Sequence, residues 1–70
     1  MGSEPTEITQ DGTQIWKNNN GDLHREDGPA VIYQDGRQFW FINGERHRED
    51  GPAEIFTDGS EKWYINGNLH

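Results

Sequence analysis

Three histidines at a regular interval are the side chains best suited to chemistry in this sequence. His24, His47 and His70 follow one another every 23 residues. If each interval contributes two strands, neighbouring histidines lie roughly 10 Å apart, because paired strands are about 4.8 Å apart. One zinc ion cannot bridge that distance, because Zn–N bonds are about 2.0–2.1 Å long. We therefore expect structural histidines, bonded to a nearby turn carbonyl or to the Asp three residues on, and no metal or cofactor.

Paired carboxylates are the second candidate for chemistry. Glu26-Asp27 and Glu49-Asp50 each follow an arginine and occur once per repeat, whereas an active site is normally unique. We expect them to form turns and salt links. Residues 18–22, Asn-Asn-Asn-Gly-Asp, lack the alternating ligands and distal Glu of a calcium loop, so a hairpin loop one residue longer is the simpler interpretation. No enzyme is predicted.

An internal repeat positions these side chains. The heptapeptide His-Arg-Glu-Asp-Gly-Pro-Ala occurs unchanged at residues 24–30 and 47–53. A fixed period of this kind indicates a repeat architecture. Alignment on it divides a single domain, residues 5–70, into repeats 5–28, 29–51 and 52–70, the last one truncated. Residues 1–4 are expected to be a disordered N-terminus or a tag remnant.

Each repeat predicts short strands joined by tight turns. Residues 30–34, 37–42 and 45–48 are the expected strands of the second repeat, and Asp35-Gly36 and Asn43-Gly44 are typical hairpin turns. No segment has a helical period. The predicted fold is therefore all-β, a single-layer antiparallel meander of hairpin repeats.

Alternation along the strands assigns two faces. One carries the isoleucines and the tryptophans Trp16, Trp40 and Trp63, which we expect to form the core. The other carries an aromatic set expected to bind a protein partner or a second copy of the chain: Tyr33, Phe39, Phe41, Phe56 and Tyr64.

The segment Trp-Phe-Ile-Asn-Gly-Glu-Arg-His at residues 40–47, on a 23-residue period, resembles the MORN repeat (membrane occupation and recognition nexus). It is most similar to divergent variants of phage, giant-virus and bacterial proteins. The resemblance spans residues 5–70 and implies an elongated antiparallel sheet with a role in binding. It departs from the usual His-Gly-x-Gly step, which is His-Arg-Glu-Asp-Gly-Pro here.

Charge and composition restrict the function. The net charge of −7 disfavours direct binding to nucleic acid or to anionic lipid. No apolar run is long enough for a membrane span, and there is no cysteine or signal peptide, so a cytoplasmic location is expected, that of the host cell if the protein is phage-encoded. Two functions remain: a protein-binding module, or a small acidic DNA-mimicking inhibitor of a host nucleic-acid-binding defence complex, of anti-CRISPR type. Because only 29% of the residues are hydrophobic, we also expect a homodimer.

The structural interpretation of the histidines predicts that stability is independent of metal. The melting temperature should be unchanged by a chelator, both in the original protein and after His24→Gln and His47→Gln. A chelator-induced drop in the original protein would show that the histidines hold an ion.

Overall fold

A computed structural model of the chain describes residues 4–69. Within that range the protein contains ten short strands and no helix. The strands are β1 (Glu7–Ile8), β2 (Gln14–Ile15), β3 (Val31–Ile32), β4 (Gln38–Phe39), β5 (Phe41–Ile42), β6 (Glu45–Arg46), β7 (Glu54–Ile55), β8 (Glu61–Lys62), β9 (Tyr64–Ile65) and β10 (Asn68–Leu69). The expectation of an all-β protein is confirmed. The expectations for residues 1–3 and for His70 lie outside the described residues.

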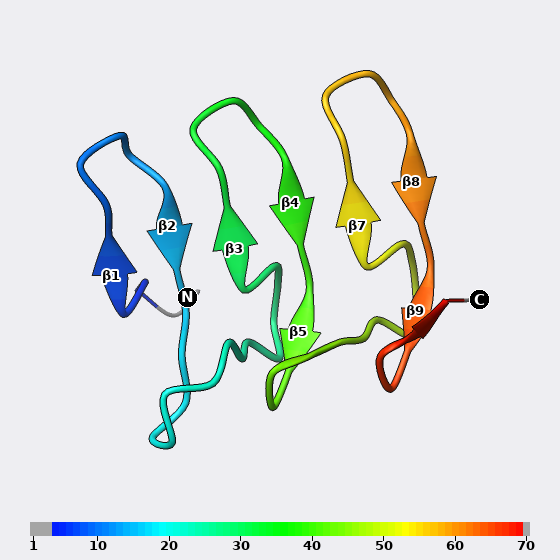
Figure 1. Cartoon of the computed structure of the whole chain (residues 1–70), viewed down its shortest axis with the longest axis horizontal. Helices are drawn as coiled ribbons and strands as arrows, with labels where there is room; N and C mark the ends of the chain where they lie inside the picture. The colour runs from blue at the N-terminus through cyan, green and yellow to red at the C-terminus, as the bar shows by residue number, and fades with distance from the viewer. Residues whose placement is uncertain (1–3, 70) are drawn as a thin grey trace.

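Three hairpins lie side by side and form one six-stranded antiparallel sheet (Figure 1). Its strand order is β1-β2-β3-β4-β7-β8. Below this sheet, β5 pairs with β6 and β9 with β10 as separate two-stranded hairpins, and a single antiparallel bridge joins Lys17 to Leu23 at the matching place in the first hairpin. Each heptapeptide leads from a lower hairpin to the next strand of the sheet.

The segment 37–42, expected as one strand, is divided at Trp40 into β4 and β5. The Trp40 N–H donates to the Ala53 carbonyl at 2.7 Å, whereas its own carbonyl accepts from the His47 N–H at 3.2 Å. One residue therefore bonds forward to the next hairpin of the sheet and back to its own lower hairpin. Trp16 makes the matching bonds with Ala30 and His24.

Two kinds of turn close the hairpins. Asn43 and Gly44 both have positive φ, 51° and 84°, as a two-residue type I′ turn requires. At Asp35-Gly36 only the glycine is left-handed, with φ 101°, and its N–H donates to Tyr33 O at 3.0 Å. The extra residue in 18–22 converts the Asn-Gly turn into this longer form, with Gly21 N–H bonded to Asn18 O at 3.0 Å. The longer-loop interpretation of residues 18–22 is thus confirmed.

Burial follows the position of a strand in the sheet more than its face. Ala30 and Ala53 are fully buried, and Val31 and Glu54, which alternation places on the opposite face, are buried as well. The prediction that the repeated isoleucines and tryptophans form the core therefore holds for Trp16, which is buried, and is wrong for Ile8 and Trp63, which are exposed. The inner strands have neighbours on both sides that cover their side chains, whereas the edge strands do not, which leaves Ile8 65% exposed.

The aspartates of the Asp-Gly turns hold these turns in shape. Asp35 accepts the Arg37 N–H at 3.1 Å, and Asp58 accepts the Ser60 N–H at 2.9 Å. These hydrogen bonds favour the charged carboxylate and lower the pKa of both aspartates. The pKa of Asp11 is lowered chiefly by a hydrogen bond from the Thr9 hydroxyl.

Stability should therefore fall in acid. A carboxyl group whose pKa is lower in the folded protein stabilises it above the unfolded value, about 3.9, and that stabilisation disappears as pH falls through the folded pKa. We expect these aspartates to contribute a decline of the melting temperature below about pH 4. Asp58→Asn, which retains an acceptor oxygen without the charge, should reduce the decline. An identical acid profile for Asp58→Asn would contradict this role.

Candidate binding groove

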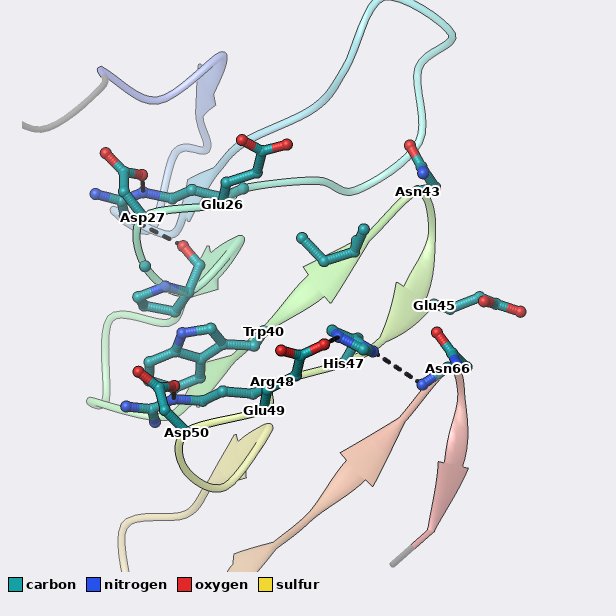
Figure 2. A pocket seen from close by; sticks show the side chains of 14 residues that line it. Glu26, Asp27, Trp40, Asn43, Glu45, His47, Arg48, Glu49, Asp50 and Asn66 are labelled. Atoms are coloured by element: carbon teal, nitrogen blue, oxygen red, sulfur yellow. Dashed lines mark hydrogen bonds and ion pairs between the residues drawn. The ribbon is translucent and has the colours of Figure 1, made fainter.

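A hollow lies between the two copies of the heptapeptide. It has a volume of about 890 Å³, and Figure 2 shows Trp40 between the loop that carries Glu26 and Asp27 and the loop that carries Glu49 and Asp50. We call it the Trp40 groove. Its lining comprises residues 25–29, Trp40, Ile42, Asn43, Glu45, residues 47–50 and Asn66.

Arg48 fixes one wall of the groove. Its guanidinium carbon lies 3.9 Å from the centre of the Trp40 ring, which is a cation–π contact. The same guanidinium donates from Nε to Asp50 at 3.1 Å and from Nη1 to the Pro52 carbonyl at 3.1 Å. Arg48 therefore connects the loop at residues 48–52 to the Trp40 ring.

Glycine at position 51 is required by this closure. A Cβ atom built on Gly51 would lie 2.6 Å from the Arg48 guanidinium carbon, well inside van der Waals contact. The loop therefore passes close under the guanidinium only because residue 51 has no side chain.

The first heptapeptide makes the same contacts. Arg25 lies 3.9 Å over Trp16, donates to Asp27 at 2.9 Å and donates to the Pro29 carbonyl at 3.2 Å. The prediction that the aspartates form salt links is confirmed at both copies. The glutamates differ, since the side chains of Glu26 and Glu49 are 83% and 81% exposed.

The histidines join consecutive hairpins. His47 Nδ1 accepts the Asn66 N–H at 3.0 Å, and His24 Nδ1 accepts the Asn43 N–H at 3.0 Å. An accepting Nδ1 carries no proton, so the proton is on Nε2, which in His47 lies 3.4 Å from Glu49. The expected partners, a turn carbonyl or the Asp three residues on, are therefore wrong: the ring accepts a turn N–H, and its acidic neighbour is the Glu two residues on.

The groove is acidic. Five carboxylates line it, Glu26, Asp27, Glu45, Glu49 and Asp50, against only two guanidiniums, Arg25 and Arg48. Both guanidiniums are held by a tryptophan, an aspartate and a carbonyl. A second hollow of about 540 Å³ lies on the other side of the first heptapeptide, near Trp16, and shares Arg25, Glu26 and Asp27 with the Trp40 groove.

The aromatic set lies on the side of the sheet opposite the groove. Phe41 is directly opposite Arg46 in the β5–β6 hairpin, whereas Ile42 and Glu45, which line the groove, form the pair that faces the other way. Phe39 packs edge-on against Tyr33 at 5.3 Å and against Phe56 at 5.6 Å. Arg46 lies over Phe41 and Tyr64 and pairs with the buried Glu54. These five rings are half-buried.

Sequence reasoning did not find the Trp40 groove. The signal for it was present, because an arginine follows Trp16 and Trp40 by nine and eight residues, at the same place in each repeat. What was missing was the information that the heptapeptide folds back over the tryptophan of its own repeat. Among residues 4–69, no three histidine or carboxylate side chains gather closely enough to hold a metal ion.

Comparisons with known proteins add no assignment. The chain was compared with protein-family models, curated proteins and solved structures, and no match was found in any of the three. In the described residues there is no helix of the length and hydrophobicity that crossing a membrane demands.

If Gly51 is needed because of Arg48, the two residues should be energetically coupled. Gly51→Ala should cost about 1 kcal/mol, since it displaces Arg48 from the Trp40 ring and from its hydrogen bonds. In an Arg48→Met background the same change should cost almost nothing, and urea unfolding followed by tryptophan fluorescence measures both.

Gly28→Ala is the matched control, because Gly28 meets Arg25 and not Arg48. Its cost should be the same in the original protein and in the Arg48→Met background. Equal costs of Gly51→Ala in both backgrounds would show that the glycine is required for some other reason.

Proposed function

We propose that this protein is a non-enzymatic protein-binding module, built from MORN-like β-hairpin repeats, three in number with the third truncated. Its binding site is the Trp40 groove, and its partner is an extended protein segment that carries lysine or arginine. The observation that carries the proposal is the placement of carboxylates on both sides of the Trp40 ring (Figure 2).

The charges in the groove favour a cationic partner. Its two arginines are already bonded within the loops, so its lining has a formal charge of −3 with His47 neutral. Glu26 and Glu49 extend into solvent from opposite walls, where they can pair with an incoming cation without first breaking an internal salt link to arginine. Such pairs give specificity and speed association more than they add affinity.

The shape favours an extended segment. The hollow near Trp16 and the Trp40 groove adjoin the same loop and share three of its residues. A peptide lying across both would meet carboxylates in each hollow. A compact small molecule would use only part of this surface.

Titration of the protein with a short oligo-arginine peptide, followed by tryptophan fluorescence, tests the site. Glu49→Gln should weaken binding about fivefold, the effect of losing one exposed ion pair of about 1 kcal/mol. Glu61→Gln removes the same charge outside both hollows and should leave the affinity within about twofold. Equal losses in both variants would contradict the groove and indicate attraction to the net charge alone.

The aromatic set predicted from the sequence is tested in the same titration. Phe41→Ser alters the opposite side of the sheet and should not change peptide affinity as long as the protein remains folded. Loss of binding in Phe41→Ser, with Glu49→Gln unaffected, would place the site on the aromatic side instead.

The exposed carboxylates also favour a second candidate, an acidic inhibitor that occupies the nucleic-acid-binding surface of another protein. The Asp50 side chain is 89% exposed, and each heptapeptide presents a Glu-Asp pair, so an acidic pair occurs twice on the surface. For a partner purified from the source cell, mimicry requires an affinity that falls steeply with salt. Docking that depends on contact with Trp40 should retain more of its affinity at high salt than mimicry does.

A further inference from the structure

The large hydrophobic side chains left exposed in the described residues lie toward the two outer edges of the molecule. Ile8 belongs to β1, the first strand of the six-stranded sheet, whereas Trp63 follows β8, the last strand, and Leu69 lies in the hairpin below it. Figure 1 shows β1 and β8 at opposite sides of the row of hairpins. Unpaired edge strands with apolar side chains readily pair with another chain.

The pairing of one hairpin with the next occurs at two places inside the molecule, and it shows the geometry that pairing between copies would use. Where β2 meets β3, Ile15 is opposite Val31, and the Trp16 N–H donates to Ala30 at 2.8 Å. Where β4 meets β7, Phe39 is opposite Glu54, and the Trp40 N–H donates to Ala53 at 2.7 Å. The register is the same with different side chains, so it is a property of the hairpins and their tryptophan position.

We propose that β8 of one copy pairs with β1 of a second copy in this same antiparallel register. Position by position, Lys62 then lies opposite Glu7 of the second copy, and Glu61 lies opposite its Ile8. The Trp63 N–H, which has no backbone acceptor among residues 4–69, donates to the Thr6 carbonyl of the second copy. The joint is a third instance of the two joints inside the chain.

Charge complementarity supports a second copy as the occupant. Lys62 and Glu7 are exposed and of opposite sign, and directly opposed side chains in antiparallel strands are about 4.5–5.5 Å apart at Cβ. At the internal joints, Ile32 and Ile55 each lie opposite a residue of the neighbouring strand and are half-buried. Ile8 would gain a neighbour at the corresponding place. The joint uses β8 of one copy and β1 of the other. Each pair of copies therefore keeps a free β1 and a free β8, to which further copies can add.

This arrangement replaces the homodimer expected from the sequence by an open row of copies. The joint lies outside the Trp40 groove, because Glu7, Glu61 and Lys62 are not among the residues that line it. The groove remains available in every copy of the row.

Sedimentation equilibrium of the original protein and of charge-reversed variants tests the joint. The mass of the original protein should rise with concentration beyond twice the 8.1 kDa chain mass. Lys62→Glu and Glu7→Lys should each remain monomeric, because each puts like charges opposite one another. An equimolar mixture of the two variants should assemble again, because a row in which the variants alternate opposes a lysine and a glutamate at every joint.

The mixture also serves as the folding control, because Glu7→Lys removes the internal ion pair with Lys17. Restored assembly requires that both variants are folded. Three results would overturn the proposal: an original protein that is monomeric at all concentrations, single variants that assemble as the original does, or a discrete dimer that is lost in Phe41→Ser but not in Lys62→Glu. A mixture that stays monomeric while both variants show the original circular dichroism spectrum would overturn it as well.

Discussion

The stacking of an arginine on the tryptophan of its own repeat is the interaction on which the other features depend. The heptapeptide has to leave a lower hairpin and return to the sheet, and it contains too few apolar side chains to be held by burial. The guanidinium of Arg48 stabilises this loop in place of buried apolar side chains, because it contacts the Trp40 ring, the Asp50 carboxylate and the Pro52 carbonyl at the same time. Once the loop is closed in this way, the Asp50 carboxylate is held beside the groove, and Glu49 next to it extends into solvent.

The same chemistry gives the two sides of the molecule different properties. On the groove side the cations are bonded within the loops, and the glutamates are left free to extend into solvent. On the other side, too, cations lie over rings, with Arg37 4.2 Å over Tyr33 and Arg46 over Phe41 and Tyr64. A cation over an aromatic ring covers apolar area while its charge remains near water. This arrangement suits a thin sheet that has few buried side chains.

A small core also explains the importance of backbone bonds between hairpins. The fully buried side chains in the described residues are the two alanines, Ala30 and Ala53, which allow the neighbouring hairpin to approach closely. Each of these alanines accepts a hydrogen bond from a tryptophan N–H, and the rings of His24 and His47 each accept one from the next Asn-Gly turn. Consecutive hairpins are thus joined at matching places, and the proposed pairing of two copies repeats this joint.

The sequence by itself determined the local structure of this protein, and the tertiary structure decided what its surface offers. Hairpins follow from Asn43-Gly44 and Asp35-Gly36, because the positive φ of Asn43, Gly44 and Gly36 requires only local interactions. The break at Trp40, the acceptor role of His47 and the burial of Glu54 could not be predicted in this way. Each depends on a partner more than ten residues from it or in another hairpin: Ala53 for Trp40, Asn66 for His47 and Arg46 for Glu54. The groove likewise exists only because two distant copies of one heptapeptide fold back over their tryptophans, and alternation along a strand carries no information about a loop that lies across it.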